Sequence, residues 1–188
     1  MPLLVAGLVL FLGIHLVPTR PALRSSLVGR FGERGYKGAF SALSAIGLVL
    51  VAVGFGSARG GPALFAPMPD ATALAPYAMA ASFTLFAAAN LRGHLRRFVR
   101  HPMLVGTILW AGVHLAANGD AASTVLFGAF LAWALVDLAS AIARGAVRAF
   151  EPSVAHDVIA LVAGTGGMLA FAMLHRVLIG VKVVPFGL

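Results

Sequence analysis

The chain has 188 residues, of which 60% are hydrophobic and 11% are charged, against roughly 25% charged residues in an ordinary soluble domain. With a mean hydropathy of +0.96, the chain has too few polar side chains to cover a soluble globule, and a disordered chain is excluded as well. The net charge of +8 does not indicate a nucleic-acid partner, because the basic residues lie in short clusters between long apolar runs. Such clusters orient membrane proteins and contact anionic lipid.

Six apolar runs are candidates for membrane-spanning helices, each of which needs about 20 mostly apolar residues. In chain order they cover residues 3–17, 39–58, 71–91, 102–117, 121–143 and 154–184. The first run lacks the basic start and the small-residue cleavage site of a signal peptide, so we expect it to form a span. The sequence therefore predicts one all-α domain over 1–188: a polytopic membrane helix bundle that contacts lipid through about six transmembrane helices. The number falls to five if the first or the fourth run is re-entrant.

Basic residues alternate between the predicted loops, and this alternation predicts the orientation of the bundle. They concentrate in the first, third and fifth loops, at Arg20, Arg24, Arg30, Arg34, Lys37, Arg92, Arg96, Arg97, Arg100, Arg144 and Arg148. The second loop carries only Arg59, and the fourth carries none. The positive-inside rule puts the basic loops in the cytoplasm, so both termini are expected to face out.

The fourth run carries the most informative face of any predicted helix. Gly106, Trp110, His114 and Asn118 recur every four residues and so form one stripe. Gly106 lets a ligand or a second helix approach closely, the ring of Trp110 gives a flat apolar surface, and the side chains of His114 and Asn118 end in polar groups. The stripe is suited to a flat ligand, and equally to ordinary helix packing in which His114 bonds to a carbonyl oxygen.

Asp137 is the only carboxylate well inside a predicted span, where ionisable residues are expensive and often functional. Its expected partner is a histidine or arginine near the cytoplasmic face, such as His15 or His101. A His–Asp pair can orient a metal-binding histidine or relay protons. The alternative is a structural hydrogen bond that sets the helix register.

Several motifs together resemble the NnrU family of small bacterial integral membrane proteins. They are HLVPTRPALR at 15–24, GERGY at 32–36, RHPMLVG at 100–106, Trp110, HLAANGD at 114–120 and Phe127. The resemblance runs from about residue 3 to residue 176. It implies a multi-pass protein of the bacterial inner membrane with periplasmic termini. It also implies an association with denitrification, through production of nitrite and nitric oxide reductases.

The NnrU family is in turn similar to the membrane-bound zeta-carotene isomerase, which binds haem b. Carried over to this chain, the resemblance implies His15 and His114 as axial ligands, with Asp137 and Asn118 supporting them and Trp110 and Phe127 lining the site. His175 is the alternative partner of His114, because the two are expected at a more similar depth. The resemblance implies a redox or nitric oxide-responsive protein, or an isomerase-like enzyme, that takes a small apolar or gaseous ligand. Ala111 stands where the isomerase has a cysteine implicated in ligand switching, so switching of that kind is excluded.

Two other functions are consistent with the same sequence. Arg100, His101 and Pro102 form the RHP motif of membrane methyltransferases of the isoprenylcysteine type, where it helps to hold S-adenosylmethionine. Those proteins usually have a tyrosine where this chain has Leu104, and their C-terminal acidic pair is absent. The third interpretation is a non-enzymatic assembly factor whose arginine-rich loops bind a protein partner.

Overall fold

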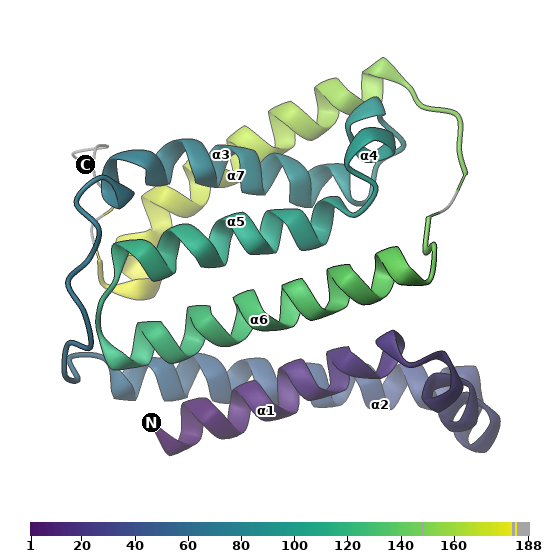
Figure 1. Ribbon diagram of the computed structural model, residues 1–188, viewed down its shortest axis with the longest axis horizontal. Coiled ribbons are helices and arrows are strands. Elements are labelled where there is room, and N and C mark those ends of the chain that lie inside the picture. Colours follow the sequence, from purple (N-terminus) through teal and green to yellow (C-terminus); the bar gives the residue numbers. More distant parts are fainter. Residues whose placement is uncertain (148, 182, 184–188) are drawn as a thin grey trace.

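The computed structural model describes residues 1–147, 149–181 and 183, and its regular elements are helices (Figure 1). In chain order they are α1 (Pro2–Leu16), the short 3-10 helix η1 (Val17–Thr19), α2 (Pro21–Ala58), α3 (Ala71–Ala88), α4 (His94–Val99), α5 (Pro102–Ala117), α6 (Ala121–Ala143) and α7 (Val154–Ile179). An isolated antiparallel bridge joins Ala63 to Asp120. The predicted all-α class is confirmed.

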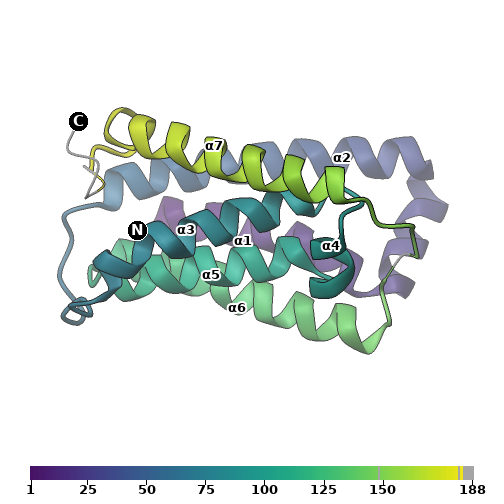
Figure 2. The same cartoon turned by 90° about the horizontal axis from the view of Figure 1, so that it is seen from above.

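The long helices α1, α2, α3, α5, α6 and α7 lie side by side in one bundle (Figures 1 and 2). Helix α6 contacts α1, α2 and α5, while α3 contacts α5 and α7. All of the long helices except α5 are long and apolar enough to cross a membrane. Helix α5 has 16 residues, which rise about 24 Å, and it packs beside α3 and α6 (Figure 1). The bundle therefore contains six long helices, five of which qualify as membrane spans by length and composition.

The outer faces of the bundle are apolar. Val9, Val49, Val136 and Val162, from four different helices, are 69%, 61%, 56% and 67% exposed. Exposed apolar surface of this extent is costly in water and favourable in hydrocarbon. The chain is thus a multi-pass membrane protein that contacts lipid.

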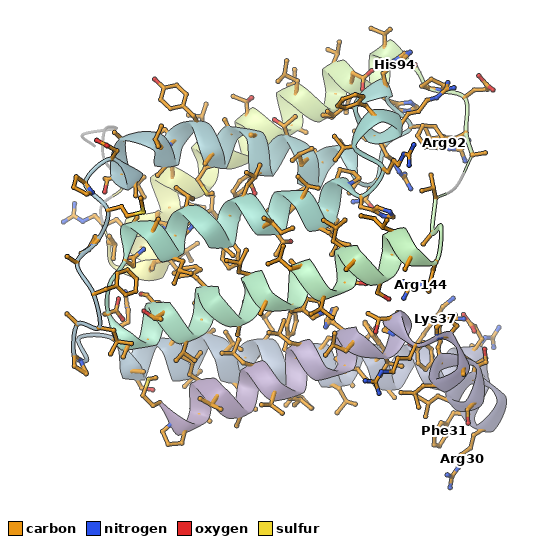
Figure 3. All side chains as sticks on the ribbon, in the orientation of Figure 1. Arg30, Phe31, Lys37, Arg92, His94 and Arg144 are labelled. Atoms are coloured by element: carbon orange, nitrogen blue, oxygen red, sulfur yellow. The ribbon has the colours of Figure 1, made fainter. Side chains whose placement is uncertain are left out.

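One end of the bundle carries most of the basic side chains. Arg30, Lys37, Arg92 and Arg144 all lie at this end (Figure 3), which we call the basic end. Met1, the loop 59–70 and the last turn of α7 lie at the other end (Figure 1). The loops that alternate in charge along the sequence are thus separated in space as predicted.

The structure corrects two predicted boundaries, the start of α2 and the end of α7. Helix α2 begins at Pro21 rather than at 39, with a break at Gly32 (φ 71°, ψ 162°), so 21–31 turns away from the long part of the helix (Figure 1). Helix α7 ends at Ile179 rather than at 184, because Gly180 adopts a left-handed conformation that ends the helix. Residues 182 and 184 lie outside the described part of the chain.

Small residues bring α1 and α2 into direct backbone contact. A Cβ atom at Gly7 would lie 2.6 Å from the nitrogen of Val51, and one at Gly47 would lie 2.8 Å from the nitrogen of Phe11. Van der Waals packing of this kind is a main source of helix association in membranes, where apolar burial supplies little driving force. The buried cluster beside it joins Leu4, Leu8 and Leu12 of α1 to Val51 and to Ala122, Leu126 and Phe127 of α6.

Candidate functional site

A pocket of about 100 Å³ lies between α3, α5 and α7, in the half of the bundle away from the basic end. Its walls are mainly apolar side chains, among them Met79 and Phe83 of α3 and Phe171 of α7. Among the residues that the structure describes, His114 of α5 and His175 of α7 are the two ionisable side chains that line it. We call this site the imidazole pocket.

His114 is held by its own helix and by aromatic neighbours. Its Nδ1 lies 2.8 Å from the carbonyl oxygen of Trp110. Because a carbonyl oxygen only accepts, Nδ1 carries the hydrogen, and Nε2 of the neutral ring keeps a free lone pair. The ring stacks on Phe127 with centroids 4.7 Å apart and lies 5.5 Å from the ring of Trp110.

The ring of His175 is hydrogen-bonded in the same way as the ring of His114, through Nδ1 to a carbonyl oxygen. Its Nδ1 lies 3.0 Å from the carbonyl oxygen of Val181, so its Nε2 is also an acceptor in the neutral ring. The two histidines lie within electrostatic range of each other. The structure therefore brings together His114 and the residue that the sequence offered as its alternative partner.

Asn118 does not line the imidazole pocket, but it stabilises the end of the helix that carries His114. Its side-chain nitrogen donates to the carbonyl oxygen of His114 at 2.8 Å, which stabilises the end of α5. The following turn is held by the loop 59–70, because Leu64 and Met68 donate backbone hydrogen bonds to Gly119 and Ala116. Backbone hydrogen bonds therefore fix the turn between α5 and α6 against this loop.

Asp120 starts α6 at this same turn. Its carboxylate accepts from the backbone nitrogen of Ser123 at 3.0 Å, as an N-cap residue does. Partial burial raises the pKa of Asp120, but the hydrogen bonds from Ser123 and Ala122 outweigh it and hold this pKa below the ordinary 3.8.

His15 lies near the basic end, far from the imidazole pocket. Its Nδ1 pairs with the carbonyl oxygen of Phe11 at 2.6 Å, and its ring packs on Phe40 and Trp133. Helices α1 and α5 run in opposite directions, and each histidine is near the C-terminal end of its helix (Figure 1). The structure therefore places His15 and His114 at opposite ends of the bundle, and α6 lies between their helices.

The family model described as NnrU protein matches residues 3–183, nearly the whole chain. The chain belongs to the NnrU family. No curated protein and no solved structure matches it.

The remaining predicted site residues of this NnrU-family chain lie at the basic end. Arg100 and His101 line a second cleft, at the corner between α4 and α5. The ion pairs of the described residues do not include Asp137 of α6, so its expected pairing with a histidine or arginine stays a prediction. The polar residues thus form two groups at the two ends of the bundle.

The imidazole pocket is a partial fit to haem b. The donor chemistry fits, because His114 and His175 each anchor Nδ1 on a carbonyl oxygen and leave Nε2 free, as haem-ligating histidines do. The predicted axial pair of His15 and His114 does not fit, because one iron cannot contact both ends of the bundle. The volume of about 100 Å³ is below the roughly 300–1,000 Å³ of sites that enclose a drug-sized ligand. The pocket as it stands does not enclose a porphyrin.

Sequence reasoning missed the apolar walls of the pocket and one polar contact. Met79, Phe83 and Phe171 carry no signal that separates them from lipid-facing residues, because every predicted span is apolar throughout. The contact is between Asp157 of α7 and α4, where the carboxylate accepts from the backbone nitrogens of His94 and Leu95, each at 2.9 Å. An acidic side chain opposite a free helix N-terminus is a recognisable signal only when the two are known to be neighbours.

Proposed function

We propose that this NnrU-family membrane protein binds a small, mainly apolar ligand in the imidazole pocket, and that His114 and His175 contact its polar part. The observation that carries the proposal is that two imidazoles line a pocket whose other walls are mainly apolar. Ligand sites commonly combine apolar walls with a few such polar groups.

The hydrogen-bonding state of the two imidazole rings predicts which chemical group of a ligand they can bind. Since both Nδ1 atoms face carbonyl oxygens, both Nε2 atoms of the neutral rings are acceptors. An acceptor requires a hydrogen-bond donor or a metal ion. We propose an apolar ligand that carries hydroxyl groups, such as a quinol or an isoprenoid alcohol.

The resemblance to NnrU proteins supplies the context of the proposal. Those proteins are associated with nitrite and nitric oxide reductases, so we propose that the bound ligand carries a redox signal or substrate for denitrification. The basic end faces the cytoplasm in this proposal, and the imidazole pocket lies in the periplasmic half of the bacterial inner membrane.

A short-chain quinol and its dimethyl ether form a matched pair of probes, since the ether keeps the ring but lacks both hydroxyl donors. We expect the quinol, and not the ether, to raise the thermal unfolding midpoint of the detergent-purified protein. His114→Ala and His175→Ala should each reduce the shift. His15→Ala is the matched control, because His15 also bonds a carbonyl oxygen four residues earlier. Equal shifts from quinol and ether would contradict the proposal.

Haem b, which the isomerase resemblance implies, is the second candidate: Nδ1 of His114 and of His175 faces a carbonyl oxygen, which leaves each Nε2 free to bind iron, and the pocket would have to widen to admit the porphyrin. The measurement is an absorption spectrum of the protein, oxidised and then reduced with dithionite, after expression with a haem precursor. A Soret band that disappears in His114→Ala and persists in His15→Ala would support haem in this pocket. A flat spectrum from pure protein would exclude it.

A further inference from the structure

The second cleft, at the basic end, has a chemistry different from that of the imidazole pocket. Its volume is about 250 Å³, and it is bounded by the α4–α5 corner and by the segment that follows α6. Arg96, Arg100 and His101 line one part of it, and Leu104 and Phe150 supply apolar surface. We call it the arginine cleft.

Arg96 and Arg100 of the arginine cleft form no ion pair with the described residues. In the described part of the chain the ion pairs join other residues, so Arg96 and Arg100 have no carboxylate partner there. The cleft includes the first residues of α5, Pro102 and Met103, and the positive end of that helix dipole adds to the field of the two guanidinium groups. Two arginines that line one cleft without a carboxylate partner attract an anion.

Side-chain contacts hold Arg96, and an unusual backbone conformation positions Arg100. The guanidinium group of Arg96 lies over the ring of Phe150, 5.4 Å from its centroid, and donates to the carbonyl oxygen of Leu91 at 3.4 Å. Arg100 has a positive φ of 64°, the only such value among the described non-glycine residues. This conformation costs free energy for an arginine, and it puts Arg100 at the corner between two helices.

We propose that the arginine cleft binds a phosphate group. Guanidinium groups match phosphate oxygens in bidentate geometry, which makes arginine the preferred side chain for this anion. The cleft lies where α3 and α6 end and α5 begins, at the basic end of the bundle (Figure 1), so both the headgroup of an anionic phospholipid and a small soluble phosphate compound can reach it. The apolar surface of Leu104 and Phe150 suits the part of the ligand attached to the phosphate. This site is separate from the imidazole pocket and does not depend on its ligand.

Native mass spectrometry of the intact detergent-purified chain, titrated with phosphatidylglycerol, tests the proposal. We expect one retained lipid for the unchanged protein, and affinity weaker by roughly ten- to a hundredfold in Arg96→Gln and Arg100→Gln, because each removes charged hydrogen bonds. Arg30→Gln is the matched control: it removes one charge at the same end, from an arginine that also lies over a phenylalanine ring, 5.5 Å from its centroid. The control should bind as the unchanged protein does.

Competition by soluble compounds identifies the source of the phosphate. Displacement of the lipid by glycerol phosphate or inorganic phosphate at millimolar concentration would identify a soluble phosphate ligand, and resistance to both would identify the lipid headgroup. Arg100→Lys keeps the charge and should restore part of the affinity, which distinguishes lost binding from lost folding. Equal weakening in Arg30→Gln, absence of any retained lipid or competing phosphate, or binding of S-adenosylmethionine in place of phosphate would each overturn the proposal.

Discussion

His15 and His114 stand at the two ends of one row of aromatic rings. The ring centroids of His15 and Phe11 are 4.4 Å apart, those of Phe11 and Phe130 are 5.8 Å apart, and Trp110 lies 5.3 Å from Phe130 and 5.5 Å from His114. Through Phe130 of α6, this row of rings connects the polar residues near the basic end with those of the imidazole pocket. The two histidines are therefore related through packing, and not as ligands of one metal.

Phe130→Leu is expected to lower the free energy of unfolding by about 1–3 kcal/mol, because Phe130 pairs with two rings and each aromatic pair contributes about 0.5–1.5 kcal/mol. Reversible denaturation in mixed detergent micelles measures the change. Phe98→Leu is the control, since Phe98 is 87% exposed, and it should change stability by less than about 0.5 kcal/mol. Equal effects of the two substitutions would show that the row does not contribute to stability.

Gly7→Ala is expected to separate α1 from α2 and to destabilise the protein by about 1–3 kcal/mol through overpacking. The new Cβ would meet backbone atoms of Leu50 and Val51 within 2.8 Å, and backbone cannot move aside as a side chain can. Gly13→Ala is the control in the same helix, because nothing lies within 4 Å of its Cβ. It should be neutral or stabilising, as alanine favours helix over glycine. A Gly7→Ala protein as stable as Gly13→Ala would contradict the observed helix contact.

Asp157→Ala is expected to release the start of α4 from α7. The carboxylate accepts from the backbone nitrogens of His94 and Leu95 and lies 2.8 Å from Nδ1 of His94. Loss of these charged hydrogen bonds should speed hydrogen exchange of the two amides roughly tenfold or more. Asp70→Ala is the control, because Asp70 precedes α3 without a side-chain capping bond. Unchanged exchange at residues 94 and 95 would argue against the contact.

The start of α6 should depend on pH through Asp120. The pKa of Asp120 is lower in the folded protein than the ordinary 3.8, so the folded state binds the proton less readily than the unfolded state does. The stabilisation is fully present above about pH 3.8 and is lost as the pH falls through the lower folded pKa.

Thermal unfolding measured from about pH 6 downward checks this dependence. Asp120→Ala should cost about 0.5–2 kcal/mol at neutral pH, the usual value of an N-cap. Asp120→Asn should keep most of the cap, because asparagine caps as well as aspartate does, and should lose the acid-dependent part. The same acid sensitivity in Asp120→Asn and in the unchanged protein would assign it to another group.

Hydropathy and charge along the chain were sufficient to predict the helix bundle. Each long helix except α2 begins and ends within five residues of a predicted apolar run, because a backbone in hydrocarbon must satisfy its own hydrogen bonds and a helix does so locally. The larger errors concern α2, which begins at Pro21 rather than at 39, and α7, which ends where Gly180 adopts a left-handed conformation. That conformation is open to any glycine, so the sequence does not distinguish Gly180 from Gly13 or Gly128.

The types of residue in the candidate sites were also predictable, since buried histidines and converging arginines are rare in an apolar chain. His114, Trp110, Arg100 and His101 were all recognised as candidates, and each lines one of the two cavities. Which of them share a site depends on helix direction and neighbourhood, which one sequence does not contain. His15 and His114 have the same local setting and lie at opposite ends, because their helices are antiparallel.

The sequence by itself determined the membrane-spanning class, the helix positions and the charge asymmetry of the bundle, because each depends on the hydropathy or charge of short continuous stretches of sequence. Only the tertiary structure decided that His114 shares its pocket with His175, that Arg96 joins Arg100 in a cleft, and that Asp157 holds α4. Those pairings join residues 61, 4 and 63 positions apart, and helix contacts in a membrane depend on small residues and close packing that hydropathy does not record.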